Sequence, residues 1–488
     1  MLSRLTQRAG GPALRVVAAS MLLTACAAGA QNYQPTRLAD VPARWSAFSE
    51  TAPRLVDNGW VASFRSSVLT QLVQDAMAHN RDLRVTAARL AEAQAMARFA
   101  GAGGFPSVSA TLGGSRTGNG SATSNVDVGL AVNWELDLWG RVRGEAMAAG
   151  YEAVAASAIH EAARQSLAAA VAETWIEVNG HARARDIARQ EVGVRQALLR
   201  GVEDRVAAQA VLAVDANWAR AELDRARERQ IAAEGDLSNA LRVLEVLTGR
   251  YPAGRLNAVT GLPQLPGRVP LGLPSQILER RPDIIAAERR VASAFHRLGE
   301  AQAARLPRIS LSGAMTRSGG SLGAALDPGR LVWTLAGNII APLIDGGQRL
   351  EAVNIRTAQQ AEALALYGAA ALTAFREVET AISNEAILRQ RLGHLNSAAA
   401  QLESAVRSER DRYEAGEAEL FRLEEMRVRY YAALRDANAV RVALLRNRVR
   451  LHLALGGSFA APAPAAVVVA PVAAASVTQT VVVASADN

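Results

Sequence analysis

The stretch from Asn125 to Gly140, which reads NVDVGLAVNWELDLWG, alternates apolar and polar residues with the period of a β-strand. Apolar side chains occupy every even position from Val126 to Leu138. A run of about 14 residues exceeds the roughly 5–6 residues of ordinary globular strands and passes the roughly 9–11 residues that a tilted strand needs to cross a bilayer. The polar face carries carboxylates and suits water, whereas the apolar face suits lipid. An amphipathic strand of a soluble sandwich fits the same pattern, so this stretch alone leaves both interpretations open.

The composition restricts how the chain could meet a membrane or a nucleic acid. The chain has 488 residues, 50% of them apolar, and its 54 basic residues are all Arg. These Arg residues are spread among Glu and Asp at helical spacing, which indicates solvated helix faces rather than a nucleic-acid surface. After the N-terminus no apolar run reaches the roughly 18 residues of a membrane-spanning helix, so any crossing would be made by strands.

The N-terminus has the composition of a bacterial export signal, because several Arg residues precede the apolar run Val16–Leu23. The following Leu23-Thr24-Ala25-Cys26 resembles a lipobox, in which the Cys is freed by cleavage and lipidated. The chain has no second Cys with which Cys26 could form an internal disulfide. We therefore expect a lipoprotein signal peptide at 1–25 and a lipidated N-terminal segment at 26–65. Cleavage after Ala28-Gly29-Ala30, as in an ordinary signal peptide, is the alternative.

From residue 66 the order helix, strand, strand, long helix, shorter helix occurs twice. The expected boundaries are a first unit at 66–248, a Pro-rich linker at 249–273, a second unit at 274–457 and a disordered tail at 458–488. Within these units we expect helices at about 66–101 and 275–304, strands at about 106–117, 125–138, 307–317 and 330–342, and a turn-rich loop at Thr117–Ser124. Asp82 and Asp283 each lie 24 residues before a strand-opening Pro and are 201 residues apart, which supports an internal repeat.

Four strands per chain cannot close a barrel, and an open sheet edge cannot remain in hydrocarbon. If the strands span a membrane, several chains must share one barrel. Two chains would give about eight strands with a filled interior, whereas three would give about twelve and begin to leave a lumen. Each half also contains a Pro-free run of roughly 68 residues, about 100 Å long as a helix, beside two shorter helices. This arrangement predicts a helical tube continuous with a strand barrel, which would serve as a conduit.

Seven short motifs occur in order along the two halves. They are Asn80–Leu83 (NRDL), Trp134–Arg141 (WELDLWGR), Arg280–Ile284 (RRPDI, after Leu273-Pro274-Ser275), Pro342–Gly347 (PLIDGG), Phe375–Glu379 (FREVE), Arg412–Gly416 (RYEAG) and Leu453–Gly457 (LALGG). With these motifs the chain resembles the TolC-like outer-membrane factors over about residues 36–459. The resemblance is to the NodT-type lipoprotein branch of resistance–nodulation–division (RND) multidrug efflux systems. It implies a mixed α and β membrane protein, a homotrimer whose 12-stranded transmembrane β-barrel continues into a long periplasmic α-helical barrel.

The resemblance implies the exit duct of a tripartite RND efflux pump, which passes small molecules such as drugs across the bacterial outer membrane. The implied partners are a periplasmic adaptor that opens the helical tips, an inner-membrane RND pump and outer-membrane lipid. We expect no enzyme activity and no cofactor besides the lipid on Cys26, since no metal-ligand spacing, P-loop or nucleophile motif occurs. The alternatives are the duct of a type I protein secretion system and a periplasmic coiled-coil scaffold lipoprotein without a pore.

The resemblance places two helix-hairpin tips at Arg205–Asp215 and Arg412–Arg429, where members of the family close the tunnel and meet the adaptor. The implied gate residues are Phe421, Arg422, Glu425, Arg429 and Asp215, and the implied adaptor contacts are Arg205, Arg412 and Gly416. In a threefold ring, copies of Glu425 would surround the axis and pair with Arg residues across protomers. Alternatively, these charges form same-helix surface pairs worth about 0.2–0.5 kcal/mol each.

The tips also depart from the family pattern at two places. Gln209 stands at the first tip where the family usually has Gly, which bears on the geometry of that turn and on its fit to an adaptor. Glu424-Glu425 stands at the second tip where an apolar residue followed by Asp is usual. Gly416, in contrast, suits the left-handed position that follows a helix.

Overall fold

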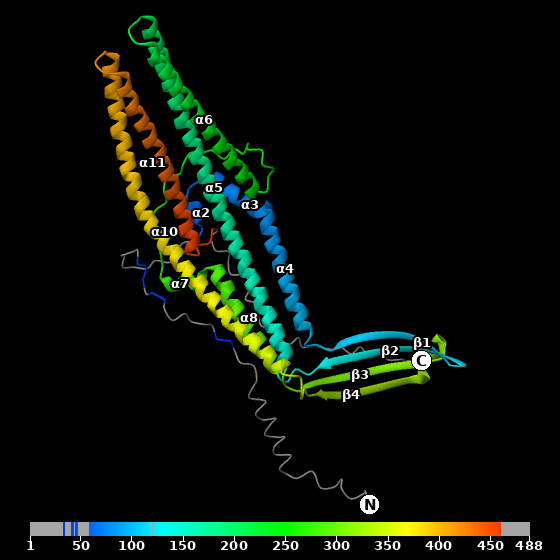
Figure 1. Cartoon of the computed structure of the whole chain (residues 1–488). Helices are drawn as coiled ribbons and strands as arrows, with labels where there is room; N and C mark the ends of the chain where they lie inside the picture. Colours follow the sequence, from blue (N-terminus) through cyan, green and yellow to red (C-terminus); the bar gives the residue numbers. More distant parts are fainter. Residues whose placement is uncertain (1–32, 35–40, 43, 47–57, 120, 460–488) are drawn as a thin grey trace, which may run out of the picture.

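The computed structural model describes residues 33–34, 41–42, 44–46, 58–119 and 121–459. Two long helical hairpins run side by side to one end of the molecule, and a four-stranded sheet projects from the other end (Figure 1). The signal peptide, Cys26 and the tail beyond Phe459 lie outside the described residues.

The main elements of the two halves correspond in order, and the four long helices correspond in length as well. The first half contains α2 (Trp60–Ser63), α3 (Ser67–His79), α4 (Arg81–Ala102), β1 (Ser107–Asn119), β2 (Ser121–Glu135), α5 (Arg141–Ala207) and α6 (Ala213–Leu247). The second half contains α7 (Pro274–Arg280), α8 (Pro282–Ala303), β3 (Arg308–Gly319), α9 (Leu322–Ala325), η1 (Pro328–Arg330), β4 (Leu331–Ile340), α10 (Gln348–Glu414) and α11 (Leu420–Ala454). Helices α5 and α10 have 67 residues each, and α6 and α11 have 35 each. Each Pro-free run thus forms one helix about 100 Å long.

The helices before the strands are each broken in two, where the sequence predicted continuous helices at 66–101 and 275–304. Asn80 adopts an extended conformation after α3 and caps α4, because its Oδ1 accepts a hydrogen bond from the Leu83 backbone N–H at 2.9 Å. In the second half Pro282 opens α8 and Arg281 before it is extended. The residue before a Pro avoids the helical conformation, which explains the second break.

The strands form one antiparallel sheet in the order β1-β2-β3-β4, with Leu130 of β2 opposite Ala110 and Met315. The predicted loop at Thr117–Ser124 was wrong, since β1 and β2 continue to pair there, as at Gly118 and Ala122. Small polar residues do not interrupt a ladder that consists of backbone hydrogen bonds. Strands β1 and β4 are the two edges within this chain.

No helix among the described residues has both the length and the apolar composition needed to cross a membrane.

The main apolar core surrounds the middle of α5. Trp175 and Ile176 are buried there with side chains from α2, α3, α6 and α11. Gly180 lies against α11, where an added Cβ would come within 2.4 Å of Val442. The Asn438 Nδ2 donates a hydrogen bond to the Gly180 carbonyl at 3.0 Å. We call this region, in which Gly180 of α5 packs against Val442 of α11, the belt.

The apolar core becomes small between the belt and the hairpin tips. A buried apolar cluster there consists of Val192, Leu223 and Ala226. Ile187, Val202 and Leu423 are also buried in this region, and each fully buried large side chain contributes on the order of 2 kcal/mol. This apolar area is much smaller than that of the main core, so polar contacts between the hairpins gain importance near the tips.

The four long helices end with the same motif, in which the residue after the cap has a positive φ. These residues are Gln209 (φ 56°), Gly249 (73°), Gly416 (80°) and Gly456 (68°). The next backbone N–H closes the turn, at 2.8 Å from Ala210 to the Arg205 carbonyl and at 2.8 Å from Glu417 to the Arg412 carbonyl. The first tip thus keeps the turn of the second, although Gln209 replaces Gly.

Exchanging the residues at the two left-handed tip positions should change stability in opposite directions. An L-residue in this conformation costs about 1 kcal/mol relative to Gly. We expect Gln209→Gly to raise the free energy of unfolding by about that amount and Gly416→Gln to lower it similarly. A Cβ at Gly416 meets open space, so the backbone conformation alone sets the cost of the substitution there. Circular dichroism at the helix band during denaturant unfolding measures both effects. Equal signs for the two variants would contradict this account.

A second prediction concerns His452, which stacks on Trp60 with ring centroids 5.8 Å apart and is buried. Burial, with a smaller effect of Arg448, lowers the pKa of His452 from 6.5 to about 4. The unfolded chain takes up this proton as the pH falls through about 6.5, whereas the folded chain does so only near pH 4. The folded state should therefore lose stability as the pH falls between these values, by at most about 3 kcal/mol.

Denaturant unfolding at pH 7.5 and pH 5 checks this, since both pH values lie about one unit or more from the pKa of His452 in the folded state and in the unfolded state. His452→Phe should reduce the difference in unfolding free energy between the two conditions. The exposed His394 provides the control, and His394→Phe should leave the difference as in the wild type. An unchanged pH dependence in His452→Phe would show that other groups cause it.

Candidate functional site: the hairpin tips and a buried ion cluster

The first tip contacts the second through a cation–π pair. The Arg205 guanidinium lies over the Tyr413 ring, 4.3 Å from its centroid, and Arg205 Nη2 also donates to the Tyr413 carbonyl at 3.5 Å. Asp215 caps α6, because its carboxylate accepts a hydrogen bond from the Leu212 backbone N–H at 3.2 Å. Arg205 thus joins the two hairpins at their ends, and Asp215 shapes the start of α6.

At the second tip, two Arg residues share one buried carboxylate. Glu409 lies 3.2 Å from Arg422 Nε and 3.4 Å from Arg412 Nη1. Phe421 lies in the first turn of α11, and 67% of its surface is exposed. Sequence analysis did not single out Glu409, although it organises two of the predicted tip residues.

Glu425 and Arg429 pair with each other along α11 at 2.6 Å, and both side chains are exposed. Within one chain, Glu425 and Arg429 thus form the same-helix surface pair that the sequence allows as the alternative to a gate ring. The structure thus brings Arg412 and Arg422 together on Glu409 and sets Glu425 with Arg429 one turn further along.

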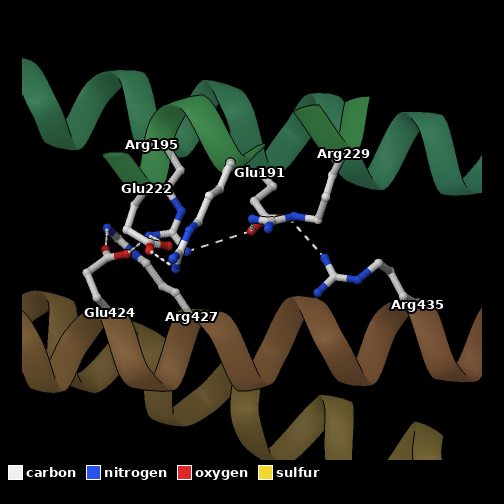
Figure 2. Close-up of polar contacts among 8 residues, drawn as sticks. Glu191, Arg195, Glu222, Arg229, Glu424, Arg427 and Arg435 are labelled. Atoms are coloured by element: carbon white, nitrogen blue, oxygen red, sulfur yellow. Dashed lines mark hydrogen bonds and ion pairs between the residues drawn. The ribbon is translucent and has the colours of Figure 1, made fainter. Parts of the chain in front are cut away.

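A second group of charges, of which sequence analysis had singled out only Glu424, lies partly buried between the hairpins. We call it the ion cluster, and Figure 2 shows it between α5, α6 and α11. It consists of Glu191 and Arg195 on α5, Glu222 and Arg229 on α6, and Glu424, Arg427 and Arg435 on α11. Glu191, Arg195 and Glu424 are at most 2% exposed.

Two carboxylates connect the hairpins within this cluster. Glu191 accepts from Arg229 at 2.8 Å and from Arg435 at 2.9 Å, so it joins all three helices. Glu424 accepts from Arg427 at 2.6 Å and from Arg195 across the hairpins. Between the belt and the tips, charge-assisted contacts thus join the two hairpins where apolar packing is smaller.

Heptad spacing was the signal that could have revealed this cluster. Glu424, Arg427 and Tyr431 follow one another at steps of three and four residues, which places them on the seam that faces α5. Charged residues at seam positions of one helix predict opposite charges on its neighbour. Among the described residues, no group of three or more His, Cys, Asp or Glu side chains is arranged to hold a metal ion.

Two adjacent glutamates provide a matched test of the ion cluster. Glu424→Gln leaves Arg195 and Arg427 buried without their carboxylate, and breaking a buried pair costs about 3–5 kcal/mol. Glu425→Gln removes only an exposed pair, worth about 0.5 kcal/mol. We expect the free energy of unfolding, measured by denaturant and circular dichroism, to fall much more in Glu424→Gln than in Glu425→Gln. Similar losses in the two variants would argue against a buried ion pair at Glu424.

The fold and its tips can now be compared with known proteins. The profile of the family "Outer membrane efflux protein" matches residues 72–250 and 273–457. Outer membrane protein OprJ of Pseudomonas aeruginosa is 30% identical over 467 residues, which cover 91% of this chain and 94% of OprJ. The pyoverdine export outer membrane protein OpmQ of the same species is 31% identical over 466 residues, which cover 91% of this chain and 97% of OpmQ.

A solved structure with the same fold is the open state of the Neisseria gonorrhoeae MtrE outer membrane channel. It superposes with a TM-score of 0.80 at 27% identity, and the match covers 88% of this chain and 98% of MtrE. Both halves of the chain lie within the matched family profile, and the relatives match along nearly their whole length. The family predicted from the seven motifs is confirmed: this chain belongs to the outer membrane efflux proteins and is an outer-membrane component of an efflux system.

Proposed function

We propose that this chain is the exit duct of a tripartite RND efflux pump, which carries small molecules such as drugs from the periplasm to the exterior. Three chains would combine their four-stranded sheets into one 12-stranded transmembrane barrel that continues into the helical tube. A periplasmic adaptor and an inner-membrane pump would complete the assembly. The two unpaired sheet edges, together with the pair of hairpins about 100 Å long, carry this proposal.

The sheet supports a shared barrel for two physical reasons. Strands β1 and β4 each have one side unpaired within the chain, and such backbone groups cannot face hydrocarbon. Leu112, Trp333 and Ile339 are exposed large apolar side chains on the strands. Pairing β1 of one chain with β4 of the next would satisfy the backbone, and lipid would cover the apolar face.

The N-terminal segment supports a lipid anchor at Cys26. Tyr33 packs against Tyr151 and Phe295, with ring centroids 6.2 and 5.7 Å away. Phe295 lies about 12 Å along α8 from its end at Ala303, next to the sheet. The chain from Cys26 to Tyr33 can span about 25 Å at most, which is enough to reach the base of the sheet.

The proposed gate is the second tip, where Phe421 would narrow the axis and Glu425 would form a threefold ring. Arg422 and Arg429 would pair across protomers when the tips approach the axis, in place of Glu409 and Glu425 of their own chain. Arg205, Arg412 and Gly416 would form the surface that meets the adaptor. An adaptor opens such a gate if it offers these charges alternative partners.

Single-channel conductance in a planar bilayer tests both the duct and its gate. We expect a small, mostly closed conductance for the wild type and a higher open probability for the double variant Arg422→Ala/Glu425→Ala. The control is Asp224→Ala/Arg227→Ala, which removes an exposed same-helix pair 3.1 Å apart on α6, in the other hairpin. A pore that responds equally to both double variants would refute the gate assignment, and a folded, inserted protein without conductance would refute the duct.

A further inference from the structure

Two Arg residues lie on the apolar face of the sheet, close to the end that points away from the helices. Residues directly opposite in an antiparallel ladder share a face. Arg116 of β1 lies opposite Ser124, and Arg317 of β3 lies opposite Val128 and Leu331. The other charged residues in the described parts of the four strands share the opposite, polar face and are Asp127, Glu135 and Arg308. The apolar face therefore carries positive charge only, and only near its far end.

The two Arg residues occupy equivalent positions in the two halves of the chain. Arg116 and Arg317 are 201 residues apart, as are Pro106 and Pro307, so each Arg follows the Pro before its strand at the same distance. Both strands run away from the helices, since β1 follows α4 and β3 follows α8. Equivalent positions in two repeated strands lie at the same height above the helices. A barrel shared by three chains, as proposed above, would therefore carry a ring of Arg residues at one level.

The level of this ring matches the outer edge of the hydrocarbon layer. Arg116 lies about 26 Å along β1 from Val108, the first apolar residue of the strand, at about 3.3 Å per residue. Strands that tilt by about 40° convert this length into about 20 Å along the barrel axis, and a long Arg side chain reaches further towards the headgroups. Outer-membrane barrels have an apolar band about 25 Å tall. The guanidinium groups thus reach the layer of lipid headgroups.

Both guanidinium groups have donors available to a ligand. Arg116 is exposed, and Arg317 uses one N–H of Nη1 to donate to the Leu326 carbonyl at 3.3 Å, although a guanidinium has five N–H donors. None of the residues opposite either Arg in the ladder is acidic. Trp333, which is 73% exposed on the same face, lies diagonally across the ladder from Arg317. A cation beside an exposed aromatic ring is typical of the boundary between lipid chains and headgroups.

We propose that Arg116 and Arg317 bind the phosphate groups of anionic lipids in the outer leaflet of the outer membrane. A guanidinium matches the oxygens of a phosphate with two parallel hydrogen bonds. The ligand is a lipid rather than free phosphate, because exposed apolar side chains such as Leu112 and Met315 lie beside the Arg residues on the same face and would contact the lipid chains. This inference rests on the proposed barrel and adds the chemistry of the lipid that covers it.

Quenching of Trp333 fluorescence by brominated lipids tests the proposal on the full-length protein in phosphatidylcholine vesicles. The Trp333 signal is the difference between the wild type and Trp333→Phe. One series of vesicles contains phosphatidic acid with brominated chains, and the other contains phosphatidylcholine with the same chains, so that only the headgroup differs. The two quenching curves give the relative affinity of the two lipids for the surface near Trp333. We expect phosphatidic acid to bind about fivefold more tightly, the effect of one basic residue at a membrane surface.

Substitution of the two Arg residues tests their part in this preference. Arg116→Gln/Arg317→Gln should abolish it, whereas Arg116→Lys/Arg317→Lys should retain most of it, because Lys keeps the charge. The matched control is Arg305→Gln/Arg308→Gln, which removes the same charge from exposed positions at the helical end of the sheet. Equal losses in the control and in Arg116→Gln/Arg317→Gln would overturn the assignment. If the latter variant does not insert, Arg317→Gln alone decides and should at least halve the preference.

The remaining outcomes separate this inference from the proposed function. Equal quenching by the two lipids in the wild type would overturn the inference and leave the barrel intact. No quenching by either lipid would show that this face of the sheet does not contact lipid, and would refute the barrel as well. A preference that a large excess of inorganic phosphate abolishes would overturn the lipid assignment in favour of a free-phosphate site. We expect inorganic phosphate to leave the preference unchanged.

Discussion

The close contact of α5 with α11 at the belt is the constraint on which the rest of the structure depends. Helix α5 contacts α3, α4, α6, α8 and α11, and most of the side chains in its middle are buried. Gly180 allows this approach because any Cβ at that position would overlap Val442. Once α5 and α11 are fixed there, the directions of both hairpins and of the strands that precede them follow, because each long helix is continuous from sheet to tip.

Helical and strand periods were sufficient to predict the large elements from sequence. The long runs lack Pro and keep one period, so nothing competes with a continuous helix. The breaks at Asn80 and Arg281 were missed because each depends on one residue, a capping amide and a following Pro, within an otherwise helical pattern. The continued pairing of β1 with β2 at Gly118 was missed because the residue types found in turns also pair well in a long ladder.

The site was predicted less completely than the fold. The tip residues came from a resemblance, which gives positions but not contacts. Glu424 and Glu425 are adjacent and identical, yet the first is buried on two Arg residues and the second is exposed. The rotation of α11 against α5 makes this difference, and that rotation is a property of the packed pair of helices. Gln209 shows the opposite case, in which the tertiary fold imposes a glycine-like turn on a residue that does not favour it.

The position of the belt gives each hairpin the mechanics of a lever. From Gly180 to the end of α5 at Ala207 the helix extends about 40 Å beyond this contact of α5 with α11. A rotation of about 10° at that contact displaces the end of the helix by about 7 Å, because a rigid helix of this length multiplies small angles. Little of the main apolar core has to move in such a rotation, since this core lies near the belt, where α5 contacts α11. Such a rotation would then mainly have to break the charged contacts between the hairpins near their tips.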